Sequence, residues 1–112
     1  MFAVFERASN RFIGEVGLAD FRRGLGKDFD GVPEAAWVFA ASSHGRGFAS
    51  EAMGAALDWF DEQCLSSRAV CIIDPDNAAS IKVANKLGFN QYGQGSYRGN
   101  HINKYERLRP ES

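Results

Sequence analysis

The sequence has little net charge, few cysteines and no long apolar run, and each shortage narrows the class of protein. Its 112 residues carry a formal net charge of −1, which gives no electrostatic indication of a nucleic-acid partner. No apolar segment approaches the length that crosses a bilayer. The two cysteines, Cys64 and Cys71, come without a secretory segment, so we expect reduced, buried thiols and a cytoplasmic location.

Two common nucleotide-binding motifs are also missing. The phosphate loop of nucleoside triphosphatases needs a Gly-Lys-Ser or Gly-Lys-Thr tripeptide, and the chain contains neither. The dinucleotide fingerprint needs a third glycine three residues after the second, and Ser50 occupies that place. A dinucleotide-dependent oxidoreductase is therefore disfavoured.

The length and composition suit one small globular domain over residues 1–112. Apolar residues make up 45% of the chain, and a chain of this size buries about two-thirds of its unfolded surface. There is no internal repeat, low-complexity tract or linker. Apolar patterns and turn residues predict strands near 1–6, 11–21, 34–41, 70–73, 90–94 and 102–108, and helices near 49–64 and 77–88.

A glycine-rich turn stands between the strand predicted at 34–41 and the first predicted helix. It belongs to the segment from His44 to Ala52, in which Gly45 and Gly47 bracket an arginine. Such a turn presents consecutive backbone N–H groups at the positive end of a helix, which makes an anion site. Glycine is needed there because a Cβ would block a close backbone approach and a positive φ. The segment therefore predicts a bound anionic group.

A second motif begins and ends the last predicted helix. Asn77 suits the N-cap position, and Ser80 follows it in the first turn. The helix closes with Lys86-Leu87-Gly88-Phe89, in which the glycine suits a left-handed exit and the phenylalanine a hydrophobic contact after it. Local chemistry alone therefore predicts both ends of this helix.

Together the two motifs resemble those of the GNAT (general N-acetyltransferase) superfamily. His44, Gly47 and Ala49 match its coenzyme A pyrophosphate loop, and the motif from Asn77 to Phe89 matches its closing helix. The resemblance covers nearly the whole chain and is strongest to the ribosomal-protein-alanine N-acetyltransferase branch. It implies an α+β fold, in which a mixed, mostly antiparallel and twisted sheet is flanked by helices.

The family fold usually begins with a strand and two helices that have no match in this sequence. The chain starts in the strand predicted at 1–6, so the resemblance implies that the N-terminal part of the fold is missing. Phe2 and Val4 would then lie on an exposed edge strand, which is open to pairing with another chain. We expect either a homodimer that covers this strand or a truncated product.

The resemblance implies acetyl-CoA as co-substrate, an amine acceptor and no metal. In the family, main-chain groups hold the coenzyme: the turn cradles the pyrophosphate, the preceding strand pairs with the pantetheine arm, and the helix cap touches a pantetheine amide. The implied coenzyme-binding residues are Trp37, Val38, Phe39, Gly45, Arg46, Gly47, Phe48, Ala49, Ser50 and Asn77. For the Arg46 side chain, a phosphate contact and a solvated surface position are equally open. The side chains of Trp37 to Phe39 are expected in the core.

The same resemblance implies direct transfer in a ternary complex, with Glu34 as general base and Ser80 as hydrogen-bond donor to the departing thiolate. A base is useful because, at pH 7, only around a tenth of α-amines and on the order of one in a thousand lysine-like amines are neutral. Other interpretations stay open. Glu34 could be a strand-end charge in water, Glu15 could be the base, and Ser80 could be an ordinary first-turn serine. Ala84 and Ile72 stand where other family members place a tyrosine and a carboxylate.

Two functions therefore remain. The leading one is an N-acetyltransferase that acts on a primary amine, either a protein N-terminus or a small amine. The alternative is a non-catalytic coenzyme A-binding or assembly module derived from the same fold. Neither reading includes a nucleic acid or a membrane among the partners.

Overall fold

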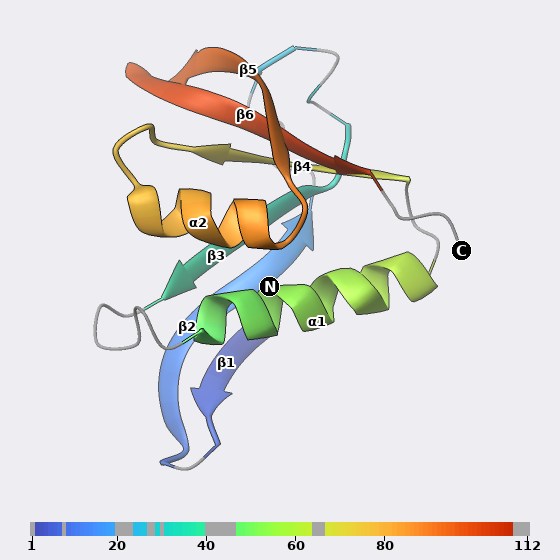
Figure 1. The fold of residues 1–112 in the computed structure, drawn as a ribbon, viewed down its shortest axis with the longest axis vertical. Helices are drawn as coiled ribbons and strands as arrows, with labels where there is room; N and C mark the ends of the chain where they lie inside the picture. The colour runs from blue at the N-terminus through green and yellow to red at the C-terminus, as the bar shows by residue number, and fades with distance from the viewer. Residues whose placement is uncertain are drawn as a thin grey trace.

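The computed structural model describes residues 2–7, 9–19, 24–26, 29, 31–39, 47–63 and 67–108. Within them, six strands and two helices follow one another along the chain. They are β1 (Phe2–Glu6), β2 (Arg11–Ala19), β3 (Glu34–Phe39), α1 (Phe48–Glu62), β4 (Arg68–Ile73), α2 (Ala78–Lys86), β5 (Asn90–Tyr97) and β6 (Asn100–Leu108). Figure 1 shows how the twist of the sheet turns β1 and β2 away from the direction of β4 and β6.

The strands form one sheet in the order β1-β2-β3-β4-β6-β5. All neighbouring strands run antiparallel except β3 and β4, which are parallel. This mixed, mostly antiparallel sheet with flanking helices confirms the predicted fold class. Among the described residues, β3 and β4 pair only at Glu34 and Val70, where the Val70 N–H also donates to the Pro33 carbonyl over 3.0 Å. Beyond Glu34 the two strands separate (Figure 1).

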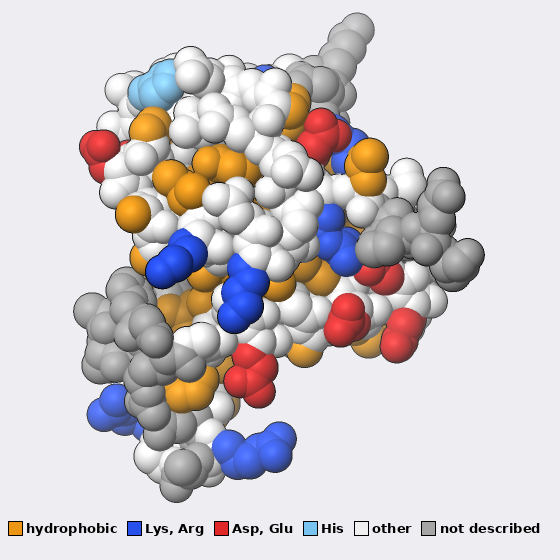
Figure 2. Space-filling model, viewed as in Figure 1, with side chains coloured by type: hydrophobic (Ala, Val, Ile, Leu, Met, Phe, Trp, Pro, Cys, Tyr) orange, Lys and Arg blue, Asp and Glu red, His pale blue; other side chains and the backbone are white. Residues whose placement is uncertain are grey.

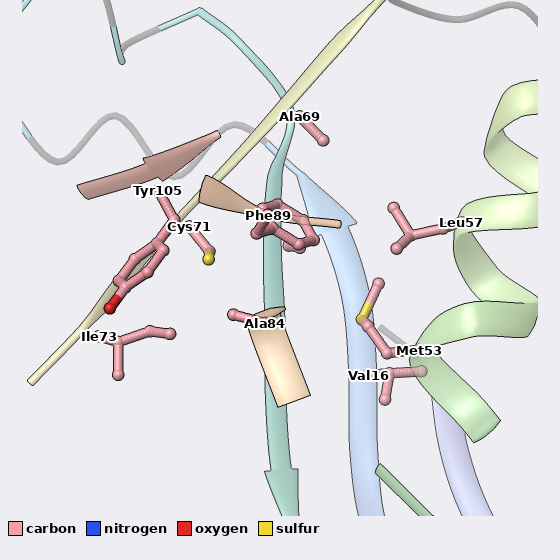
Figure 3. Packing of buried hydrophobic residues seen from close by; sticks show 10 residues of the cluster. Val16, Met53, Leu57, Ala69, Cys71, Ile73, Ala84, Phe89 and Tyr105 are labelled. Carbon is pink, nitrogen blue, oxygen red and sulfur yellow. The ribbon is translucent and has the colours of Figure 1, made fainter. Parts of the chain in front are cut away.

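Both helices bury apolar side chains in one core against the sheet. Met53 and Leu57, four residues apart on α1, are at most 2% exposed, and Ala84 of α2 is fully buried. In Figure 3, Phe89, which follows α2, lies between these α1 side chains and Cys71 of β4. The buried positions of α1 thus follow the spacing of one face of a helix.

Alternation along β3 places its side chains on two different faces. Ala35, Trp37 and Phe39 pack in or against the helix-side core, so Glu34 and Val38 project from the opposite face. The single strand therefore supplies both a core face and a face that leads away from the helices. Strand alternation therefore places Glu34 on the face of β3 opposite Ala35, Trp37 and Phe39.

The last two strands are longer than the sequence predicted. We expected 90–94 and 102–108, whereas β5 reaches Tyr97 and β6 begins at Asn100. The ladder between them continues through exposed polar residues such as Ser96, so backbone pairing rather than burial maintains these ends. Residues 20–21 and 40–41 of two other predicted strands, and Cys64 at the predicted helix end, lie outside the described residues.

β1 is an edge strand, as predicted, but its exposed apolar residues are different from those we expected. Val4 lies on this edge strand as expected, but its side chain is half-buried and packs against the core. Phe5 is 55% exposed, and Phe12 of the neighbouring β2 is 50% exposed. Their rings meet edge to face with centroids 5.7 Å apart. The side chain of Phe2 lies outside the described part of the structure.

Candidate active site

The start of α1 has the backbone conformation that the glycine-rich turn requires. Gly47 is the N-cap residue, with φ +80° in the left-handed region, and its carbonyl accepts from the Glu51 N–H over 3.0 Å. Glycine has no side chain with which to cap the first-turn amides of the helix, and a helix N-terminus of this kind can bind an anion. His44, Gly45 and Arg46 lie outside the described residues, and their predicted roles stay predictions.

A groove of about 740 Å³ runs from this helix start along β3 to α2. Three predicted segments line it together: Trp37–Phe39 of β3, residues 47–50 at the start of α1, and Asn77 with the first turn of α2. Lys82 and Lys86 of α2 also line it, and sequence reasoning missed both. Figure 2 shows basic side chains gathered over α2, beside the start of α1.

One edge of β3 borders this groove within the described residues. β3 pairs with β2 along its whole length, but on its other side it pairs with β4 only at Glu34. The edge from Trp37 to Phe39 thus faces the groove instead of a neighbouring strand. An extended ligand carrying amide groups could add to such an edge through main-chain hydrogen bonds.

A smaller cavity of about 230 Å³ adjoins the groove at the point where β3 and β4 separate. Glu34 and Ser80, predicted as the two catalytic residues, both line it, although they are 46 positions apart in the chain. Trp37, Val38, Asn77 and Ser80 line both the groove and this cavity. The structure therefore brings the predicted base and the predicted donor to one place, next to the predicted coenzyme groove.

Asn77 caps α2 as predicted. Its side-chain Oδ1 accepts from the Ser80 N–H over 3.1 Å, and its carbonyl accepts from the Ile81 N–H over 3.1 Å. The Ser80 hydroxyl is half-buried and receives a hydrogen bond from the indole Nε1–H of Trp37 over 3.3 Å.

We expected the side chains of Trp37, Val38 and Phe39 in the core; this is wrong for Val38, which is 69% exposed because strand alternation turns it to the other face, whereas Trp37 and Phe39 pack against the core. The Trp37 ring does pack near Phe89, at 6.3 Å between centroids, but its polar end reaches the candidate site.

Glu34 is buried, with 2% of its surface exposed. This corrects the alternative in which it is a strand-end charge in water. The nearby Cys71 thiol is also buried, and its pKa is raised by desolvation and further by the negative charge of Glu34. Cys71 is a free thiol, as predicted, and it stays protonated at neutral pH. A protonated, enclosed thiol is a poor nucleophile.

Other sequence candidates fall outside this arrangement. Glu15, considered as another base, is exposed on β2 and lines neither cavity. Ala84 is completely buried in the core and lines neither cavity. Across the described ranges, no three His, Cys, Asp or Glu side chains gather to hold a metal ion. In the same part of the chain, no helix combines the length and apolar character needed to span a bilayer.

The family model for the acetyltransferase (GNAT) domain matches residues 1–90. The chain belongs to the GNAT family. GNAT acetyltransferases use acetyl-CoA as co-substrate, and the residues that line the groove are of the types that could hold it. Its lining combines a left-handed glycine at a helix start, where backbone amides can bind an anion, with the edge of β3, to which an extended amide-bearing chain can add.

Individual relatives agree with the GNAT assignment. The chain is 31% identical over 85 residues to the uncharacterized protein YkkB of Bacillus subtilis, a match covering 76% of this chain and 47% of that protein. A Bordetella pertussis protein described as a GNAT-family acetyltransferase superposes with a TM-score of 0.87 at 37% identity, covering 95% of this chain and 64% of that one.

A ribosomal-protein-S5-alanine acetyltransferase of Vibrio fischeri shares the same fold. It superposes with a TM-score of 0.80 at 18% identity, over 97% of this chain and 61% of that protein. The GNAT chain thus spans about half the length of the curated relative and under two-thirds of these two solved structures.

Proposed function

We propose that this chain transfers an acetyl group from acetyl-CoA to a primary amine, either a protein N-terminus or a small amine. One observation carries the proposal: the groove beside the α1 start and the small cavity that holds Glu34 meet at Ser80 and Trp37. A thioester lying along the groove and an amine entering the small cavity would meet there. Positioning two reactants in this way can supply much of the rate of such a transfer.

The coenzyme would be held mainly by main-chain groups. The proposed pyrophosphate contacts are the amides from Gly45 to Ser50, of which Gly47 and residues 48–50 line the groove. The proposed pantetheine contacts are the main chain from Trp37 to Phe39 and the Asn77 side chain, which also line it. Since Asn77 uses its Oδ1 for the Ser80 N–H, its side-chain amide N–H₂ is left to donate to a ligand.

Glu34 is the proposed general base. Glu34 lines the small cavity, and in this proposal its carboxylate takes the proton that the attacking amine must lose. Ser80 is the proposed donor to the sulfur, which leaves with the electron pair of the broken C–S bond as the C–N bond forms. The transfer is direct in this proposal, since the buried Cys71 thiol stays protonated and is a poor nucleophile, and Cys64 lies outside the described residues.

An amine panel with coenzyme release as readout tests this function. Peptides with a free N-terminal alanine, a polyamine and single amino acids are each incubated with acetyl-CoA and the protein. We expect turnover on at least one amine. Glu34→Gln, which removes the proposed base, should lower kcat by about 10²-fold or more. Ser80→Ala, which removes the proposed donor, should lower kcat about tenfold. Tight binding of acetyl-CoA without turnover on any amine would refute the enzymatic proposal and leave the non-catalytic coenzyme-binding module.

Gly47→Glu tests the coenzyme site itself. Gly47 lines the groove, so a carboxylate there should repel the pyrophosphate and abolish acetyl-CoA binding in calorimetry. Gly31→Glu is the matched control. Gly31 has a similar φ of +86°, both positions leave open space for a Cβ, and Gly31 lines neither cavity. Equal loss of binding in the two variants would show that backbone strain, not the groove, is responsible.

The remaining proposals concern the surroundings of the site. A homodimer that covers β1, a single domain over residues 1–112 and a cytoplasmic location stay predictions from the sequence. The exposed Phe5–Phe12 pair beside the edge of β1 supports the dimer.

A further inference from the structure

The Trp37 side chain connects β3 to α2, the helix that carries Ser80. Its indole Nε1–H donates to the Ser80 Oγ over 3.3 Å, from β3 to α2, across 43 positions of sequence. The apolar part of the ring packs near Phe89, with a centroid distance of 6.3 Å and an interplanar angle of 58°. The ring is thus anchored by the core while its N–H stands at the junction of the two cavities.

The chemistry of the two groups fixes the direction of this hydrogen bond. An indole N–H can only donate, whereas a serine hydroxyl has one donor hydrogen and can accept through its oxygen. The Ser80 oxygen therefore accepts, and its hydrogen is still available. Among the described residues, no acceptor takes that hydrogen, and the hydrogen bond to Asn77 comes from the backbone N–H of Ser80.

We propose that Trp37 is a positioning residue that holds the Ser80 oxygen and so leaves the hydroxyl hydrogen to be donated to the coenzyme sulfur. A hydroxyl without such a partner rotates freely and can turn its hydrogen toward other acceptors, including a helix carbonyl. A donated N–H also polarises the hydroxyl and strengthens the hydrogen bond that it gives in turn. This inference rests on the proposed acetyl transfer and adds a role for the Trp37 side chain that the family motif did not suggest.

A double-mutant cycle with Trp37→Phe and Ser80→Ala tests the connection. Phenylalanine keeps a ring against Phe89 but lacks the N–H, so the fold should persist, as checked by thermal unfolding. We expect kcat to fall about 3- to 10-fold, the range of one net hydrogen bond, with KM for acetyl-CoA changed less than about twofold. In the Ser80→Ala background the same change should have no further effect, because the tryptophan acts through the serine.

Trp59→Phe is the matched control. Trp59 is 49% exposed on α1 and lines neither cavity, so its replacement should leave kcat unchanged. Independent, multiplying effects of Trp37→Phe and Ser80→Ala would show that Trp37 does not act through Ser80. A Trp37→Phe variant that folds normally and keeps the wild-type kcat would overturn the inference as well, although the proposed acetyl transfer would stand.

A second readout needs no turnover. Free coenzyme A is titrated on the protein across the alkaline range, and the ultraviolet absorbance of its thiolate is followed. A donated hydrogen bond favours the thiolate, so Trp37→Phe and Ser80→Ala should each raise the midpoint of ionisation of bound coenzyme A by about 0.5 to 1 pH unit. An unchanged midpoint in Trp37→Phe with a raised one in Ser80→Ala would reject the role of Trp37 even if no amine is ever acetylated. Failure of wild type to bind coenzyme A would reject the proposed function and this inference together.

Discussion

At the scale of single residues, Cys71 makes stability depend on pH. Burial raises the pKa of its thiol above that of an unfolded cysteine, and the charge of Glu34 raises it further. Below the unfolded pKa of about 8.5, both states hold the proton and the contribution is constant. Above that value the unfolded chain loses the proton while the folded chain keeps it, so the free energy of unfolding falls as the pH rises.

We therefore expect the free energy of unfolding of the wild-type protein to fall between pH 7 and pH 10 by on the order of 2 kcal/mol more than that of a Cys71→Ala variant. Urea unfolding of both proteins at several pH values measures this difference. The alanine changes stability at every pH by removing buried volume, but it cannot change the pH dependence through its own titration. Parallel curves for the two proteins would contradict the buried, protonated thiol.

The residues of the candidate site differ in how far the sequence could predict them. Asn77 caps α2 through a contact three residues along the chain, so the local pattern was sufficient. The burial of Glu34 depends on the parallel pairing with β4, which adjacent sequence does not encode. The Trp37–Ser80 hydrogen bond spans 43 positions, and its indole was interpreted only as an apolar group. Local chemistry was thus predictable, whereas contacts made by the folded sheet were not.

At the scale of elements, Gly14 sets how closely β2 approaches β3. A Cβ at this position would collide with the Val38 carbonyl oxygen and would come within 2.8 Å of the Phe39 ring. A carbonyl in a paired strand cannot move aside as a flexible side chain can. Gly14→Ala should therefore destabilise the fold by about 1–3 kcal/mol and weaken acetyl-CoA binding, because β3 carries one wall of the groove.

Gly93→Ala in β5 is the matched control for this prediction. There the new Cβ meets only the Lys104 side chain, at 3.3 Å, and a flexible lysine can yield. We expect its free energy of unfolding to stay within about 0.5 kcal/mol of wild type in urea titrations. If both alanine variants were equally stable, the close β2–β3 approach would not be a constraint on the fold.

Lys82 and Lys86 give α2 a positively charged face along the groove. They stand four residues apart, where like charges slightly destabilise a helix, and both are exposed. Lys86 also lies in the last turn, where a cation suits the helix dipole, but Lys82 does not have that benefit. Attraction to the phosphates of coenzyme A offers one reason for both positions.

Lys82→Gln and Lys86→Gln should each weaken acetyl-CoA binding by about 0.5–1 kcal/mol at low salt, and less at high salt because ions screen exposed charges. Calorimetry at two salt concentrations measures the effect. Lys104→Gln is the control, since Lys104 of β6 lies over the Tyr92 ring and lines neither cavity. Losses of equal size in all three variants would indicate a general charge effect instead of a local one.

At the scale of the whole molecule, the open edge at β1 favours association with a second copy. β1 ends the sheet, and Phe5 and Phe12 expose about half of their surfaces beside it. An edge strand presents unpaired peptide groups, and adjacent aromatic surface gains free energy when it leaves water. The predicted homodimer would bury both features at once.

Phe5→Lys should therefore weaken the dimer at least tenfold in sedimentation equilibrium, because it removes a phenylalanine worth about 1.5–3 kcal/mol on burial and places a charge at the edge. Leu108→Lys is the control. Leu108 is 64% exposed at the end of β6, and β2, β3 and β4 lie between β6 and the β1 edge of the sheet. This control should leave association unchanged. A wild-type protein that stays monomeric at tens of micromolar would reject pairing through β1, because a strand edge with exposed aromatic rings would then persist in water without a partner.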